Sequence, residues 1–245
     1  MRLIKICGIQ SIDAAETAVI NGADLLGCIL VPKRSRTVTP DLAKRISQLV
    51  RHKRSKTIEQ ILEGIAKRDF ASSTVLDYFA FLQHEILQNG PFLVGVFRNQ
   101  PFDEVLHVAK ELNLDFIQLH GDENKLEFIK AGKEHGFGVI PRYVIPQQVE
   151  KLKSDSEEIM KLGSLSIPLL DSDQGGEGKV IDWEYINVNL GFTRCILAGG
   201  LNPENLAQTE QVNNVIGYDV SGGVETNGEK DMVKIAQFIA RGKAI

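Results

Sequence analysis

A cysteine ends the first apolar run of the chain, LIKIC at residues 3–7, and Gly8 follows it directly. Cysteine is most often buried as a small hydrophobic residue. A glycine at the next position lets the backbone turn, which places the thiol near the open end of a strand. A thiolate in such a place can accept a proton or attack a substrate. The residues alone therefore leave two interpretations of Cys7 open, a packing residue or a nucleophile or base.

Two glycine-rich segments, AGGLNPEN at 198–205 and DVSGGVE at 219–225, follow the last two apolar runs. Backbone amides at the start of a helix can bind an oxyanion, and the helix dipole strengthens this binding. If the fold is a barrel, the loops after its last two strands are the usual phosphate site. Two such loops in succession are stronger evidence than one Gly-Gly pair. The residues predicted to bind phosphate are Gly199, Gly200, Ser221, Gly222 and Gly223.

The cysteines and histidines of the chain give no sign of a metal site. The three cysteines, Cys7, Cys28 and Cys195, include no close pair, which fits neither a disulfide framework nor a zinc-binding CxxC motif. Cys28 and Cys195 lie inside apolar runs, and we interpret both as core residues. The five histidines are scattered, and no dinucleotide fingerprint follows the first strand. The sequence predicts reduced thiols and neither a metal nor an organic cofactor.

Composition and charge exclude several classes of protein. The 245 residues are 43% hydrophobic and 24% charged, which is typical of a globular protein and not of disordered or collagen-like chains. A net charge of −4 argues against a nucleic-acid partner. The one short basic cluster, RHKRSK from Arg51, is interpreted as a solvated surface. No stretch approaches the roughly 18 apolar residues of a membrane span, so we expect no membrane partner and a cytoplasmic location.

Eight short apolar runs recur along the chain, and a segment with helical periodicity follows each of them. They cover residues 3–7, 24–30, 92–97, 115–120, 138–143, 166–171, 193–199 and 214–220. Helix-start signals open the segments SIDAAETAVIN, TPDLAKRISQLV and NPENLAQ, which follow the first, second and seventh runs. The chain is therefore predicted to be a succession of eight βα units.

The eight units predict an α/β protein, a single (β/α)₈ TIM barrel over residues 1–245. Continuous rather than alternating hydrophobicity indicates parallel strands that helices cover on the outside. An open doubly wound sheet is the alternative architecture. The barrel is preferred because polar and glycine-rich residues follow the strands directly, and a barrel gathers all eight of those loops around one mouth.

Residues 51–90 interrupt the alternation of strands and helices. They contain two further helical patterns with no strand between them. We interpret them as an α-helical insertion between the second helix and the third strand. Because the segment begins after a helix and returns to a strand, it belongs at the N-terminal face of the barrel, away from the chemistry. It is structural padding or an oligomer contact, and the protein is predicted to be a monomer or a homodimer.

Strand alternation places a possible charged pair beneath the thiol. Lys5 shares a face with Cys7, because side chains two residues apart in a strand point the same way. Asp219 on the last strand points inward as well, because that strand closes against the first, and it is also counted among the predicted substrate-binding residues. A Lys5–Asp219 pair could leave positive potential under Cys7, or Lys5 could merely neutralise Asp219. His120, at the end of the fourth run, either contacts a substrate or caps its own loop.

The motifs KICG, PKRSR, QLHGDE, LLDSDQGGEGKVIDW, LAGGLNPEN and DVSGGVETNGEKD resemble, in order and spacing, the phosphoribosylanthranilate isomerase family of tryptophan biosynthesis. The resemblance extends from Lys5 to the C-terminal helix and omits the insertion. It implies the same (β/α)₈ barrel and a phosphoribosyl small-molecule substrate. It also implies an Amadori rearrangement of N-(5-phosphoribosyl)anthranilate to 1-(2-carboxyphenylamino)-1-deoxyribulose 5-phosphate.

The resemblance also assigns roles to three residues. It makes Cys7 the base that removes the C2 proton, Asp171 the acid that protonates the ribose ring oxygen, and Arg36 the residue that binds the anthranilate carboxylate. The chemistry agrees, provided that a cation lowers the pKa of the thiol and that burial keeps the carboxyl protonated. A guanidinium suits the carboxylate because it can bind with two parallel hydrogen bonds. Arg98 and Arg142 are expected only at the rim.

Other barrel proteins remain as alternatives. A non-catalytic phosphosugar-binding barrel would keep the glycine loops but would not need both Cys7 and Asp171. Related enzymes such as indole-glycerol-phosphate synthase or the histidine-pathway Amadori isomerase are also possible, although the latter ends its first strand in aspartate rather than cysteine. A Schiff-base aldolase would need a lysine at the mouth, where Lys5 is too deep and Lys179 lies in a loop. Activity on the histidine-pathway substrate stays open.

Overall fold

The computed structural model describes residues 1–68, 70–171 and 182–245, and these include a closed barrel of eight parallel strands in sequence order. The strands are β1 (Leu3–Cys7), β2 (Leu25–Ile29), β3 (Phe92–Phe97), β4 (Phe116–Leu119), β5 (Gly138–Val144), β6 (Leu169–Asp171), β7 (Cys195–Leu197) and β8 (Val215–Val220). Each lies within or overlaps one of the eight predicted apolar runs. The pairing of β8 with β1 closes the barrel, so the barrel prediction is confirmed and the open sheet is excluded.

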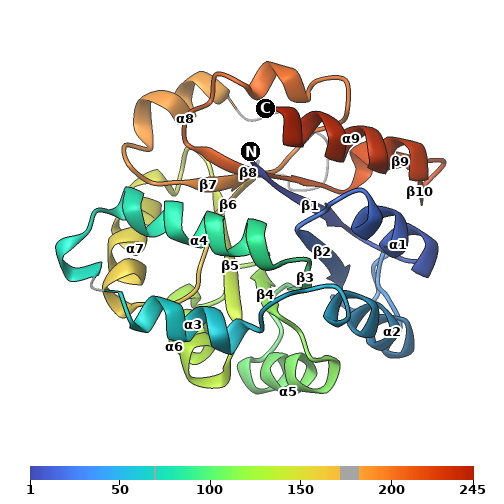
Figure 1. Ribbon diagram of the computed structural model, residues 1–245, viewed down its shortest axis with the longest axis horizontal. Coiled ribbons are helices and arrows are strands. Elements are labelled where there is room, and N and C mark those ends of the chain that lie inside the picture. The colour runs from blue at the N-terminus through green and yellow to red at the C-terminus, as the bar shows by residue number, and fades with distance from the viewer. Residues whose placement is uncertain (69, 172–181) are drawn as a thin grey trace.

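Helices surround the barrel on the outside (Figure 1). They are α1 (Ile12–Ile20), α2 (Pro40–Arg51), α5 (Phe102–Leu112), α6 (Lys125–His135), α7 (Val149–Leu162), α8 (Trp183–Asn189) and α9 (Met232–Ala244). Side-chain caps mark the starts of α1, α2, α8 and α9. Ser11 Oγ accepts a hydrogen bond from the Ala14 N–H at 3.1 Å, and Thr39 caps α2 with proline at the first helical position.

The segment after β7 differs from the prediction, because NPENLAQ does not begin an α-helix. It forms one 3₁₀ turn, η2 (Leu206–Thr209). Asn202 Oδ1 accepts hydrogen bonds from the N–H groups of Glu204 and Asn205, both at 2.9 Å. The Asn205 amide in turn donates to Gly200 O at 2.8 Å. These bonds satisfy the backbone in a turn conformation, so the asparagines favour a compact turn over a helix.

The segment after β8 also begins with a 3₁₀ turn, η3 (Gly222–Val224), where the prediction placed the start of a helix. A short hairpin follows, with strands β9 (Glu225–Thr226) and β10 (Glu229–Lys230), and α9 begins only after it. The hairpin was not predicted. It folds back beside the end of β8, which brings two charged side chains to the edge of the barrel mouth.

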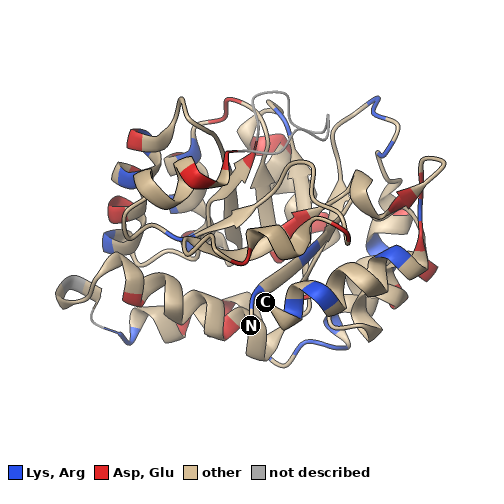
Figure 2. Ribbon diagram, turned by 90° about the horizontal axis from the view of Figure 1, so that it is seen from above, with Lys and Arg blue, Asp and Glu red and all other residues tan. Residues whose placement is uncertain are grey.

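Residues 51–90 form α3 (Ile58–Ala66), the 3₁₀ turn η1 (Phe70–Ser72) and α4 (Val75–Asn89). Figure 1 shows α4 lying across the barrel, and Figure 2 shows it on the side of the molecule where the termini lie. The Gln83 amide donates to Met1 O at 3.1 Å and to Ile216 O at 3.2 Å, both at the start of strands of the barrel. The helix therefore covers the N-terminal face, as the order of elements predicts.

The contacts of α4 are those of a core element rather than of padding. Phe79, Leu82 and Ile86 are fully buried. The Tyr78 hydroxyl donates to Ser164 O at 2.6 Å, just before β6. Burying a large apolar side chain stabilises a fold by about 1.5–3 kcal/mol. Among the described residues, no helix is long and apolar enough to cross a membrane.

Candidate active site

A cavity of about 590 Å³ opens at the carboxyl ends of the strands, opposite α4. All ten predicted site residues line it, although they come from six different loops or strand ends. They are Cys7, Arg36, His120, Asp171, Gly199, Gly200, Asp219, Ser221, Gly222 and Gly223. The structure therefore brings together every residue that the sequence singled out for chemistry. Arg98, expected at the rim, also lines the cavity.

The charged pair predicted beneath the thiol is present. Lys5 is fully buried, and its Nζ donates to Asp219 Oδ1 at 2.7 Å. The register that pairs Lys5 with Asp219 across β1 and β8 places these two side chains on the same inner face. Gly27 on β2 makes room for the group, because a Cβ there would lie 2.8 Å from Cys7 Sγ and 3.1 Å from Lys5 Nζ. A lysine thus reaches the underside of the cysteine.

The pKa of Cys7 differs from the expectation. Burial raises the pKa of this thiol above its ordinary value, and Lys5 offsets only part of the effect while Asp219 adds to it. The condition that a cation lowers the pKa of this thiol is therefore not met in this arrangement, because desolvation outweighs the neighbouring cation. Burial alone would lower the pKa of Lys5, but Asp219 and Cys7 raise it, so Lys5 stays an ammonium.

Arg36 is held by a carboxylate that sequence reasoning missed. Its Nε and Nη2 donate to the two oxygens of Glu225 at 2.9 and 2.8 Å, a bidentate pair. Lys230 Nζ, which is almost fully buried, donates to Glu225 Oε1 at 2.7 Å and to Ser221 O at 2.9 Å. Burial would raise the pKa of Glu225, but Arg36 and Lys230 lower it overall. Glu225 is therefore a carboxylate shared by two cations at the edge of the mouth.

Asp171 lies at the end of β6, is 3% exposed, and pairs with an arginine. Arg142 Nε donates to Asp171 Oδ2 at 3.2 Å. Arg142 was expected only at the rim, and the structure corrects this, because the pairing of β5 with β6 brings it beside the proposed acid. The Gly-Gly-x-Gly-Lys stretch at 175–179 lies outside the described residues.

The two glycine loops pack backbone against backbone. Gly199 and Gly200 have φ values of 87° and 67°, a region that glycine adopts without strain. A Cβ on Gly223 would lie 1.9 Å from Leu201 O, so only glycine allows the two loops to approach this closely. The glycines thus have a structural reason, and phosphate binding by these loops stays a prediction.

His120 does not cap its own loop. Glu123 does so instead, since its carboxylate accepts from the N–H groups of Gly121 at 2.9 Å and Asn99 at 2.7 Å. Burial, with Arg142 and Arg98 nearby, lowers the pKa of His120 to about 3, so the ring is neutral. Among the described residues no group hydrogen-bonds its Nδ1. The ring is therefore available to a ligand in the cavity.

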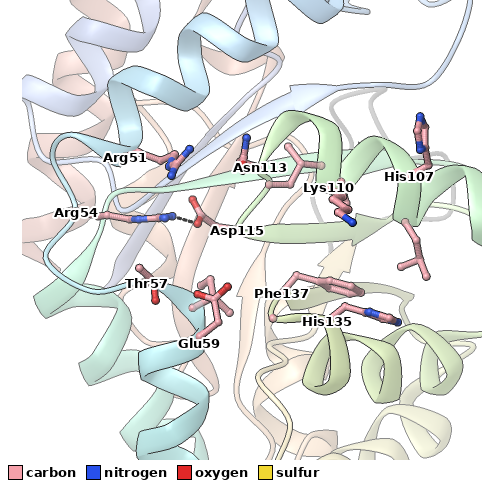
Figure 3. Close-up of a pocket in the computed structure, with 15 residues that line it drawn as sticks. Arg51, Arg54, Thr57, Glu59, His107, Lys110, Asn113, Asp115, His135 and Phe137 are labelled. Atoms are coloured by element: carbon pink, nitrogen blue, oxygen red, sulfur yellow. Dashed lines mark hydrogen bonds and ion pairs between the residues drawn. The ribbon is translucent and has the colours of Figure 1, made fainter.

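A second cavity, of about 650 Å³, lies away from these residues, between the start of the 51–90 segment and the ends of α5 and α6 (Figure 3). Arg54 pairs there with Asp115, which also accepts a hydrogen bond from the Leu93 N–H at 2.8 Å. Arg54 belongs to the basic cluster that we expected at the solvated surface, but its side chain is only 13% exposed. The prediction was wrong for this residue, because its guanidinium forms an ion pair with the buried carboxylate of Asp115.

The remaining basic residues of the second cavity have a structural explanation. Arg51, Lys110 and His135 lie in the last turns of α2, α5 and α6. Cations are favourable there because the C-terminal end of a helix carries partial negative charge. The basic character of this cavity follows from three converging helix ends.

Comparison with known proteins gives a consistent result. Residues 52–241 match the family model "N-(5'phosphoribosyl)anthranilate (PRA) isomerase". The chain is 50% identical over 244 residues to the N-(5'-phosphoribosyl)anthranilate isomerase of Candida albicans, covering 100% of this chain and 99% of the relative.

Two solved structures are also similar over the whole length of both chains. One shows mutually generated monomers of the dimeric phosphoribosylanthranilate isomerase from Thermotoga maritima, with a TM-score of 0.70 and 27% identity. The other is a phosphoribosylanthranilate isomerase in complex with reduced 1-(o-carboxyphenylamino)-1-deoxyribulose 5-phosphate, with a TM-score of 0.70 and 28% identity.

Proposed function

We propose a division of labour among the cavity residues from the premise that this chain belongs to the N-(5'-phosphoribosyl)anthranilate isomerase family. The reaction converts N-(5'-phosphoribosyl)anthranilate to 1-(o-carboxyphenylamino)-1-deoxyribulose 5-phosphate in tryptophan biosynthesis. One observation carries the proposal, namely that a thiol and a carboxyl, Cys7 and Asp171, line one cavity together with an arginine and two glycine loops.

The substrate is seated by its two charged ends. The phosphate binds at the loops that carry Gly199 and Gly222, where backbone amides can surround an oxyanion. The anthranilate carboxylate binds Arg36, whose Nη1 side is turned away from its bond with Glu225. Glu225 and Lys230 hold the guanidinium in place before the substrate arrives. The sugar then lies between the two ends, over Cys7.

The rearrangement needs one proton donor and one proton acceptor. Asp171 gives a proton to the ribose ring oxygen while the bond between that oxygen and C1 breaks, which leaves an iminium between C1 and the anthranilate nitrogen. The Cys7 thiolate then removes the proton from C2, and the electron pair of that bond forms a C1–C2 double bond and neutralises the iminium. The resulting enol tautomerises to the C2 ketone of the product.

The charges around the two groups support these roles in different ways. The Cys7 thiol first loses its own proton to water, Lys5 stabilises the thiolate that results, and Asp219 holds Lys5 in position. Asp171 is buried beside Arg142, whose Nε donates to its carboxyl at 3.2 Å and fixes its position at the end of β6. His120, neutral and facing the cavity, is assigned to the sugar.

The activity can be followed by the loss of anthranilate fluorescence after purified protein is added to freshly prepared substrate. Turnover is expected with the full chain and no added metal or cofactor. Folded protein that binds ribose 5-phosphate but gives no turnover would favour the non-catalytic phosphosugar-binding barrel. Adding the histidine-pathway substrate to the same protein and separating substrate from product by chromatography would decide whether the chain accepts it.

The chain is proposed to be one domain, residues 1–245, with 51–90 as an inserted part of it. The bonds from α4 to Met1 O and Ile216 O support this, because they tie the segment to the barrel. A single thermal unfolding transition is expected, and a separate early transition would contradict it. Light scattering on purified protein would decide between the monomer and the homodimer.

A further inference from the structure

Gln118 is a buried polar residue of the catalytic cavity to which neither the sequence motifs nor the mechanism gives a role. It lies on β4, two residues before His120, so both side chains point to the inside of the barrel. Gln118 is 2% exposed, and both residues line the cavity that contains Cys7 and Asp171.

The side chain of Gln118 has no protein partner that explains its presence. Its Oε1 is buried and forms no hydrogen bond with the residues that the structure describes. A buried amide without partners costs free energy, and an apolar side chain of similar size would fill the same space without that cost. A glutamine at this position therefore indicates a polar ligand.

Comparison with the other unpartnered groups supports this interpretation. Among the described residues, buried side-chain atoms without a hydrogen bond also occur in Ser164, Ser166 and Trp183. None of these three residues lines the catalytic cavity. Gln118, on β4, and His120, directly after its end, in contrast both line this cavity. Two adjacent polar groups in one cavity form a small polar surface that can bind neighbouring hydroxyls.

The proposed function assigns the sugar of the substrate to His120 alone. The phosphate is assigned to the glycine loops, the carboxylate to Arg36, the ring oxygen to Asp171 and the C2 proton to Cys7. The polar atoms that remain are the ribosyl hydroxyls. We infer that Gln118 hydrogen-bonds a ribosyl hydroxyl of the substrate and, beside His120, makes the site selective for the sugar. This inference rests on the proposed function.

The test compares wild type with Gln118→Met, which keeps the length of the side chain and removes its polar atoms. The variant is expected to lower kcat/KM by about ten- to a hundredfold, the scale for one hydrogen bond lost inside a closed site. Competitive inhibition by ribose 5-phosphate should weaken to a similar extent. Inhibition by anthranilate or inorganic phosphate, which carry no sugar hydroxyl, should not change.

A stability measurement separates this role from a structural one. Because the amide has no protein partner, Gln118→Met is expected to keep or raise the Tm of the free protein while activity falls. Ser166→Ala is the matched control, since it removes another unpartnered buried group outside the cavity and should leave all kinetic constants unchanged. If Gln118→Met does not fold, Gln118→Leu is measured in the same way.

Two outcomes would overturn the inference. One is an unchanged kcat/KM and an unchanged ribose 5-phosphate inhibition in a folded Gln118 variant. The other is an equal weakening of ribose 5-phosphate and inorganic phosphate, which would indicate a general distortion of the site. Failure of the proposed function would look different, because the wild-type protein itself would then give no turnover.

Discussion

The two cavities of this molecule are similar in size, and each contains an arginine–aspartate ion pair. They differ in whether their buried polar groups form hydrogen bonds with the protein. The catalytic cavity measures about 590 Å³ and contains the pair Arg142–Asp171, while the second measures about 650 Å³ and contains the pair Arg54–Asp115. Neither volume nor the presence of a buried ion pair distinguishes them.

Hydrogen bonding distinguishes them clearly. Asp115 of the second cavity is bound by Arg54 on one oxygen and by the Leu93 N–H on the other. Among the described residues, no buried polar side-chain atom that lines this cavity lacks a partner, whereas Gln118 and His120 of the catalytic cavity each leave one unpaired. The buried polar groups of the second cavity are thus occupied by the protein itself, whereas two of those in the other cavity are available to a ligand.

The largest expected effect falls on the second cavity and concerns stability alone. Asp115→Ala removes the partner of a buried arginine and should lower the free energy of unfolding by about 3–5 kcal/mol. Chemical denaturation measures this. KM and kcat of the folded fraction should match wild type, and Arg51→Ala, on the same rim but without an ion pair among the described residues, should be nearly neutral. A changed KM in Asp115→Ala would break the distinction between the cavities.

In the catalytic cavity, Arg36 is expected to affect binding and not stability. Arg36→Ala should weaken substrate binding by about 2–4 kcal/mol, the scale for removing one member of a desolvated charge pair. Arg36→Lys should restore only part of this, because an ammonium cannot form two parallel hydrogen bonds with a carboxylate. Initial rates at varied substrate concentration give the KM values. Equal KM in all three proteins would remove Arg36 from the site.

Glu225 should show a smaller effect of the same kind. Glu225→Gln keeps the shape of the side chain but loses the charge that holds Arg36. The loss of substrate binding is expected to be about 1 kcal/mol, so KM should rise roughly fivefold while kcat changes little. The measurement is the same initial-rate series as for Arg36. Tighter binding in Glu225→Gln would show that this carboxylate competes with the substrate for Arg36 instead of positioning it.

The smallest effect concerns the pH dependence of the thiol. Burial raises the pKa of Cys7, so alkylation of Cys7 by iodoacetamide should accelerate with rising pH and reach half its maximum above the ordinary pH for a thiol. Lys5 offsets part of this rise, and Lys5→Met should therefore move the alkylation curve to higher pH. Alkylation can be followed at this residue by mass spectrometry. A curve shifted to lower pH in Lys5→Met would contradict the role given to Lys5.

The barrel and the glycine loops could be predicted from patterns within single segments, whereas Asp171 and Arg36 were singled out through the resemblance to a known family. Continuous apolar runs indicate parallel strands, and the residues that follow such strands must meet at one end of the barrel. The pair of Lys5 and Asp219 could be predicted as well, since it needs only strand alternation and the closure of the first and last strands.

The partners of the site residues could not be predicted, because they depend on geometry between segments. Arg142 reaches Asp171 only through the register of β5 with β6. Glu225 and Lys230 meet Arg36 only because a hairpin folds back after β8. Whether Lys5 lowers the pKa of Cys7 could not be decided from the sequence either, since a sequence shows a nearby cation but not the depth of burial that outweighs it.

The central claim is that Cys7 is the base of the reaction and not a packing residue, and the turnover of Cys7→Ser tests it most directly. Serine keeps the shape and hydrogen bonding of the thiol but does not ionise near neutral pH. The account predicts a fall in kcat of about a hundredfold or more, with KM nearly unchanged and the Tm close to wild type. A folded Cys7→Ser protein with near wild-type kcat would contradict the account and make Cys7 a packing residue.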